Sequence, residues 1–87
     1  MKFAVVYTYP PNKERIAQAR PDHRAYLGGL REQGKVVAAG PFAEDAGALI
    51  IYEADSESAL TRLIEDDPFF KAGVFAERSV RQWNQVL

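Results

Sequence analysis

The β-strand-like segments of this 87-residue sequence are apolar on both faces, and this limits how the chain can fold. Four segments are predicted to be strands because they are rich in β-branched and aromatic residues. They are 2–9, 35–42, 47–54 and 74–83. The second reads VVAA and the third ALIIY, without the apolar–polar alternation of a sheet that has one wet face. Gly40 and Pro41 should end or bulge the second strand, because proline cannot donate to a central ladder.

The segments between these strands have helical patterns. The predicted helical segments are a turn over 13–19 capped by Asn12, a helix over 21–34, a helix over 57–66 capped by Asp55 or Ser56, and a turn over 68–73. Pro21 should separate the first two, because proline suits a first helical turn and breaks a helix interior. Gly34 and Gly73 are expected stops. Gly28 and Gly29 weaken a helix by roughly 1 kcal/mol each relative to alanine, so close packing would have to compensate there.

The order β-α-β-β-α-β predicts a single α+β domain over residues 1–87. It is the ferredoxin-like arrangement, an antiparallel sheet with its helices on one face. No sequence remains to cover the second face, so we expect a second copy to pack on it, sheet to sheet, as a homodimer. The alternative is a small monomer with an exposed apolar sheet. A wedge between the first helix, the sheet and the partner is a natural place for a small apolar cavity.

Charge and residue usage argue against several functional classes. The 11 basic and 12 acidic residues nearly cancel, and no Lys/Arg cluster indicates nucleic-acid binding. With no cysteine and one histidine, neither a disulfide nor a zinc site is expected. The longest apolar run, 46–52, is far shorter than the ~20 residues that span a bilayer. No signal peptide is evident, and we expect a cytoplasmic protein that binds no membrane and no cofactor.

The only histidine, His23, lies in step with Leu27 and Leu30 on one helical stripe. If the helix begins at Pro21, the imidazole lies in its first turn and faces the sheet. The positive end of the helix and burial both disfavour a charged ring, so we predict a neutral imidazole that can act as a base. The alternative is a core histidine that simply bonds a backbone group.

Asp67 precedes Pro68, which keeps it out of helical geometry. One interpretation is an N-cap with proline at the next position. The other is a carboxylate that contacts the imidazole, fixes its tautomer and stabilises its protonated form. The residues themselves do not place Asp67 beside His23, so both interpretations stay open.

Three motifs in order resemble the YCII-related (YciI-like) family: RPDHRAYL at 20–27, AAGPF at 38–42 and DDPFFKAGVFAERSV at 66–80. The resemblance covers nearly the whole chain. It implies a dimeric α+β barrel, related in fold to muconolactone isomerases and small cofactor-free monooxygenases. It also implies that His23 and Asp67 share a pocket as a catalytic pair. One branch is similar to a dehydrochlorinase of a chlorinated hydroxyhydroquinone.

Further candidates are substrate-binding residues. They are Arg20, Gly40, Pro41, Phe69, Phe75 and Ser79. Arg20 begins the first motif and either steers an anionic or phenolic ligand or is a surface arginine. Gly40 and Pro41 are expected to shape the pocket wall. The aromatic side chains are core or interface residues, some of which could line a pocket for a flat ligand. Ser79 either points into the site or is only a strand residue.

Two functions remain open from the sequence. The first is a cofactor-independent enzyme of isomerase, lyase or dehydrochlorinase type. In it, His23 moves a proton on a small cyclic or aromatic-derived compound and Asp67 orients the ring. The second is a non-catalytic, dimeric binding or accessory protein whose pocket holds a metabolite. No metal ion is expected in either.

Overall fold

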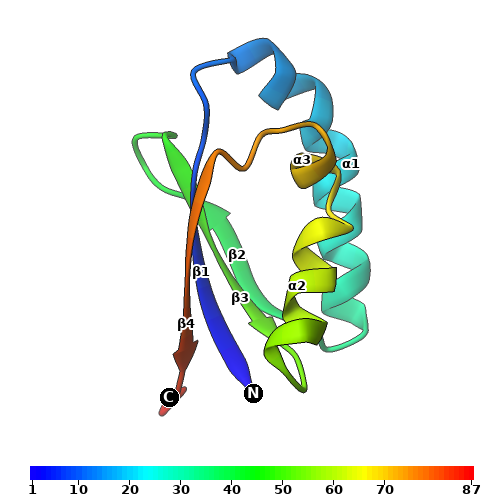
Figure 1. The fold of residues 1–87 in the computed structure, drawn as a ribbon, viewed down its shortest axis with the longest axis vertical. Helices are drawn as coiled ribbons and strands as arrows, with labels where there is room; N and C mark the ends of the chain where they lie inside the picture. Colours follow the sequence, from blue (N-terminus) through cyan, green and yellow to red (C-terminus); the bar gives the residue numbers. More distant parts are fainter.

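A computed structural model describes all residues, Met1–Leu87, and has the predicted α+β order of elements (Figure 1). The strands are β1 (Lys2–Thr8), β2 (Val36–Pro41), β3 (Gly47–Glu53) and β4 (Glu77–Trp83). The helices are α1 (Lys13–Glu32), α2 (Glu57–Glu65) and α3 (Pro68–Lys71). The strands form one four-stranded antiparallel sheet in the order β2-β3-β1-β4. All helices lie on one face of it, which confirms the ferredoxin-like prediction (Figure 1).

The predicted break between two N-terminal helices is wrong. α1 is one helix of 20 residues with Pro21 inside it, and its N-cap is Asn12, as expected. One buried stripe, formed by Ile16, His23 and Leu30, continues at seven-residue intervals across the proline. Packing of this stripe against the rest of the protein outweighs the backbone hydrogen bond that proline cannot make.

All four predicted strands need corrections at their ends. β2 begins at Val36 instead of Lys35 and ends one residue before Phe42, and β3 ends at Glu53 instead of Ala54. β1 ends at Thr8 instead of Tyr9. β4 begins at Glu77 instead of Val74, because the side chains before it turn inward: Val74 is buried. β2 does end at Pro41, which is tolerated because β2 is an edge strand, but the register shift lies between Val36 and Ala38 instead of at Gly40 and Pro41.

The glycines of α1 and α3 fall into two kinds. Gly34 and Gly73 have φ angles of 76° and 72° just after these helices, which confirms them as stops. Gly28 and Gly29 lie inside α1, and a Cβ atom added at either would meet no atom within 4 Å. The expectation of close packing at Gly28 and Gly29 is therefore wrong within this chain.

The inner face of the sheet, toward the helices, forms the core. Its buried members from the two central strands are Phe3, Val5, Tyr7, Ile50 and Tyr52. The hydroxyls of Tyr7 and Tyr52 lie 2.8 Å apart in a buried hydrogen bond. Burial raises the pKa of both tyrosines well above the usual value, so this pair stays protonated.

The outer face of the sheet has no cover from this chain. Side chains alternate across a strand, so Val6 lies on the face opposite to buried Val5 and Tyr7. Leu49 and Ser79 pair with Val6 and share its face. The outer face is therefore apolar over the central strands β1 and β3, and mostly polar over β4. None of the helices combines the length and apolarity needed to cross a membrane.

Candidate active site

His23 and Asp67 lie in direct contact, although 44 residues separate them in sequence. The imidazole Nδ1 is 2.7 Å from Oδ1 of the carboxylate and 2.9 Å from Oδ2. His23 is 7% exposed and Asp67 is 0% exposed, so water does not separate or screen the pair. The structure therefore provides the contact that the sequence left open.

Asp67 is held from two sides. It lies between α2 and α3 with an extended backbone (φ −68°, ψ 131°), as the following proline requires. Its Oδ1 accepts a hydrogen bond from the Phe69 backbone N–H at 2.9 Å. The same carboxylate caps α3 and contacts the imidazole of His23, so the two interpretations of Asp67 are compatible.

Aromatic rings fix the orientation of the imidazole. Phe69 stacks on His23 with ring centroids 3.7 Å apart and an interplanar angle of 9°. Phe75 meets His23 edge-on at 5.9 Å. Because an ionised carboxylate accepts the proton of Nδ1–H, the lone pair of a neutral ring is on Nε2. Nε2 is then the nitrogen available to a ligand.

The predicted position of His23 in the first turn of a helix is wrong. It lies well inside α1, because the helix continues through Pro21. The partial charge of a helix N-terminus acts only within about the first turn, so it does not explain the state of this ring. The nearby acidic group is Asp67, whose Oδ1 lies 2.7 Å from Nδ1 of the imidazole.

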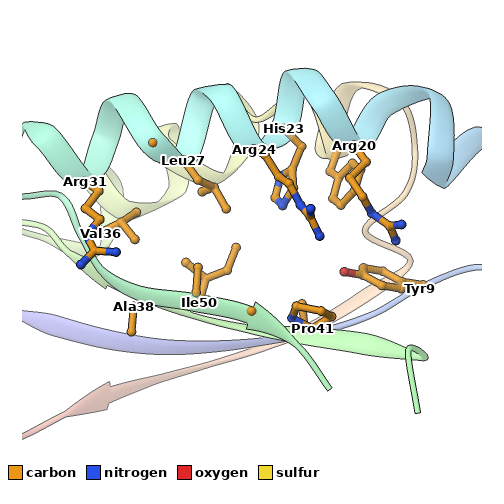
Figure 2. A pocket seen from close by; sticks show the side chains of 15 residues that line it. Tyr9, Arg20, His23, Arg24, Leu27, Arg31, Val36, Ala38, Pro41 and Ile50 are labelled. Carbon is orange, nitrogen blue, oxygen red and sulfur yellow. The ribbon is translucent and has the colours of Figure 1, made fainter. Parts of the chain in front are cut away.

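A pocket of about 320 Å³ opens beside the pair, between α1 and the strands β2 and β3 (Figure 2). His23 and Leu27 point toward it from α1, and Ile50 points toward it from β3 (Figure 2). The sequence-predicted residues that line it are His23, Arg20, Gly40, Pro41 and Phe69. The motifs of the first helix and the second strand therefore meet at one site.

Three predicted site residues do not line this pocket. Asp67 is fully buried and touches the site through His23. Phe75 lies behind the His–Asp pair and stacks on Tyr7 with centroids 3.6 Å apart. Ser79 lies on the outer face of the sheet, since it pairs with Val6 in the antiparallel register. Within one chain, the idea that Ser79 points into the site is therefore wrong.

Several lining residues were not predicted from the sequence. They include Arg24, Leu27, Gly28 and Arg31, whereas Tyr9 is one of the aromatic residues that the sequence offered as pocket lining. Burial raises the pKa of Tyr9, so its phenol stays protonated and can donate to a ligand. Arg24 and Arg31 follow Arg20 at i+4 and i+11, a spacing that marks one helix face. No three His, Cys, Asp or Glu side chains come together in a way that could hold a metal ion.

Fold and site together define a small ferredoxin-like α+β domain with a buried His–Asp pair beside a pocket. The chain belongs to the YCII-related domain family, whose sequence model matches residues 1–84. Protein YciI of Escherichia coli O6:H1 is 30% identical over 84 residues, which cover 85% of this chain and 86% of that protein. The family resemblance is therefore confirmed.

Solved structures share the fold. One is 5-chloro-2-hydroxyhydroquinone dehydrochlorinase from Burkholderia phenoliruptrix, in complex with 2,5-dihydroxybenzoquinone. It matches with a TM-score of 0.86 and 29% identity, over 99% of this chain and 96% of that chain. An antibiotic biosynthesis monooxygenase matches with a TM-score of 0.62 and 18% identity, over 99% and 98% of the two chains. This second likeness is one of fold alone.

Proposed function

We propose that this protein is a cofactor-independent acid–base enzyme that acts on a small cyclic, aromatic-derived compound. The observation that carries the proposal is the buried contact of 2.7 Å between His23 Nδ1 and Asp67 Oδ1 beside the pocket. A histidine that lines a pocket and is backed by a carboxylate is suited to proton transfer. His23 is the catalytic residue in this proposal, and Asp67 is its positioning residue.

The proton follows a defined route in this proposal. Nε2 of His23 accepts a proton from a C–H or O–H bond of the ligand, while Asp67 accepts the hydrogen bond from Nδ1–H and balances the new positive charge. In an isomerisation, the imidazolium returns the proton to a different ligand atom. In an elimination, the electron pair of the broken bond forms a double bond, chloride leaves, and the imidazolium releases its proton to water.

The pocket and the similar dehydrochlorinase both support a ring-shaped ligand. At about 320 Å³, the pocket is at the small end of the range for ligand sites. Phe69 and Pro41 offer apolar walls, and Arg20 offers a cation. The dehydrochlorinase, 29% identical, is named for a chlorinated hydroxyhydroquinone and was solved with a dihydroxybenzoquinone. Hydroquinones, quinones and related lactones are therefore the first compounds to test.

The decisive experiment compares turnover of chlorinated hydroxyhydroquinones, quinols and lactones by wild-type protein and His23→Gln. We expect the variant to lose about 10²–10⁴-fold in kcat, the usual contribution of a positioned general base. Gln18→Ala, at an exposed position of the same helix, is the control and should keep full turnover. Equal turnover by His23→Gln would contradict the proposal. A wild-type protein that binds 2,5-dihydroxybenzoquinone but converts none of these compounds would instead be a binding protein.

The outer sheet face supports a homodimer. Val6 is 38% exposed and Trp83 is 38% exposed on a face that the helices do not reach. Packing of this face on the same face of a second copy would bury these side chains and close a common core. Sedimentation velocity should show a dimer that Val6→Lys converts to monomer. A monomeric wild-type protein would contradict this assembly.

A further inference from the structure

One stripe of α1 brings arginines and a glycine to the pocket. Arg20, Arg24, Gly28 and Arg31 all line it. They follow one another at i+4, i+8 and i+11, so they share a helix face beside the stripe that carries His23. The proton-transfer chemistry proposed above uses neither Arg24, Gly28 nor Arg31. Proton transfer therefore does not explain why these residues line the pocket.

The charge of the pocket is opposite to that of the chain. Its 15 lining residues include three arginines and no Asp or Glu, whereas the whole chain has a net charge of −1. Arg20 has one acidic neighbour, Asp45, at 3.9 Å from Nη2 to Oδ1. Arg24 and Arg31 have no acidic partner among the ion pairs of the structure. The pocket therefore offers uncompensated cations to a ligand.

The cations are spread along the pocket and do not converge on one point. Figure 2 shows Arg20 near Tyr9 at one end, Arg31 near Val36 at the other, and Arg24 between them. An α-helix rises about 1.5 Å per residue, so the backbone positions of Arg24 and Arg31 are about 10 Å apart along the axis. Two separated anionic groups suit this arrangement better than one.

The middle of the pocket is apolar. Leu27 and Ile50 enter it from opposite sides, from α1 and from β3 (Figure 2). An apolar body between two charged ends would match this lining, because the ends can meet guanidinium groups while the body displaces water.

Gly28 keeps space open at the same place. A glycine inside a helix is unfavourable relative to alanine, and no atom of the chain lies within 4 Å of where a Cβ would be. Gly29 has equal space, but it does not line the pocket. Packing within the chain therefore explains neither glycine. The pocket gives a reason for Gly28, because this residue lines it.

We propose that, among cyclic compounds, this pocket selects an elongated dianion whose rings form an apolar body, which lies along α1 between Arg24 and Arg31 and passes over Gly28. This proposal adds the class of ligand to the proposed function. It rests on the proposed function only for the position of the chemistry, at His23. Its tests use unreactive probes, so they can fail or succeed independently of turnover.

The first test compares probes by calorimetry with wild-type protein: biphenyl-4,4′-dicarboxylate, its neutral diamide, and benzoate. The dicarboxylate should bind at least tenfold more tightly than either other probe, and its affinity should fall with added salt. Arg24→Gln and Arg31→Gln should each weaken dicarboxylate binding by roughly tenfold, the value of one charge-assisted hydrogen bond. Arg62→Gln, an equal charge loss at an exposed position of α2, should change affinity less than twofold.

The outcomes of this test separate the two proposals. No binding of the dicarboxylate, equal affinity for the diamide, or an equal effect of Arg62→Gln would overturn ligand selection by the arginines. None of these results bears on whether His23→Gln abolishes turnover of ring compounds. Conversely, a protein without turnover that shows the expected probe selectivity would overturn only the enzymatic proposal.

The second test uses the two glycines as a matched pair. Gly28→Ala and Gly29→Ala should both fold at least as stably as wild type, because alanine favours a helix and has room at both positions. Gly28→Ala should weaken dicarboxylate binding by at least tenfold, because its methyl group enters the ligand's space. Gly29→Ala should leave the affinity within twofold. Equal effects of the two substitutions would overturn the role of Gly28.

Discussion

α1 and α2 cover the same face of the sheet, but they do so differently. α2 fills the space beneath it with Leu60 and Ile64, which are 2% and 1% exposed. α1 buries Leu30 at one end, but over β2 and β3 it leaves the pocket beside His23. One helix therefore completes the core, and the other leaves part of the sheet available to a ligand.

The difference lies in what each helix presents to the sheet. The apolar residues of α2 repeat at helical spacing, and they face the core. The side of α1 toward the pocket carries Leu27 and His23, but also Arg24, Gly28 and Arg31, which are exposed and do not add to the core. Such departures from a well-packed pattern are expected where a protein does its chemistry. Stability should therefore depend more on α2, and function more on α1.

The largest expected effect is a loss of stability when an apolar side chain of each helix is replaced by alanine. Ile64→Ala should lower the free energy of unfolding by about 2–5 kcal/mol, because it opens a cavity in a filled core. Leu27→Ala should cost only about 1 kcal/mol, because Leu27 is half-buried and its truncation enlarges a pocket that already exists. Chemical denaturation of both variants measures the difference. Equal losses of unfolding free energy would show that α1 and α2 contribute equally to the packed core.

The next largest effect on stability is expected at Asp67, because its carboxylate contacts His23 and also caps α3. Asp67→Ala should cost about 2–3 kcal/mol, because α3 loses its cap and the buried imidazole loses its partner. Asp67→Asn should cost less, because an amide oxygen can still accept the hydrogen bond from Phe69 N–H. Thermal unfolding of the two variants tests this order, and the reverse order would mean that the cap is unimportant.

A smaller effect is expected where α1 and α2 are joined. The Tyr26 hydroxyl donates a hydrogen bond to the Leu63 carbonyl at 2.6 Å. Tyr26→Phe should cost about 0.5–1.5 kcal/mol, because the partly buried carbonyl loses its donor. Denaturation at neutral pH measures this loss. A variant as stable as wild type would show that the two helices are held together by apolar contacts alone.

The smallest effect is a change in how the stability of the protein depends on pH, and it also concerns Tyr26. Burial raises the pKa of Tyr26 to about 12. An unfolded tyrosine ionises near pH 10, so the unfolded chain loses this proton first and stability falls as the pH rises from about 10 to about 12. In Tyr26→Phe, stability should fall less steeply over this interval. Parallel curves for the two proteins would contradict the shift.

Element order was predictable because each boundary has a local signal. Gly34 and Gly73 stop helices, and Ser56 caps α2, with effects that reach only a few residues. The continuity of α1 was not predictable in this way. Pro21 has a strong local effect, and it is overcome by burial of Ile16 on the far side of the proline, which depends on the whole fold.

The site was only partly predictable for the same reason. No local pattern brings Asp67 to His23, because their contact depends on how the chain after α2 returns to α1. The family resemblance indicated the pair. The arginine stripe was hidden by the predicted helix break, which left Arg20 outside the helix that contains Arg24 and Arg31. With α1 as one helix, spacing alone places the three on one face.

The strand that walls the pocket is an edge strand of the sheet. β2 lies at the sheet edge and is hydrogen-bonded only to β3, and its residues from Ala38 to Pro41 are exposed. Changes of side chain there would alter the shape of the ligand site while the central strands keep their pairing. Substitutions in β2 are therefore a way to reshape the proposed ligand site with little penalty to folding.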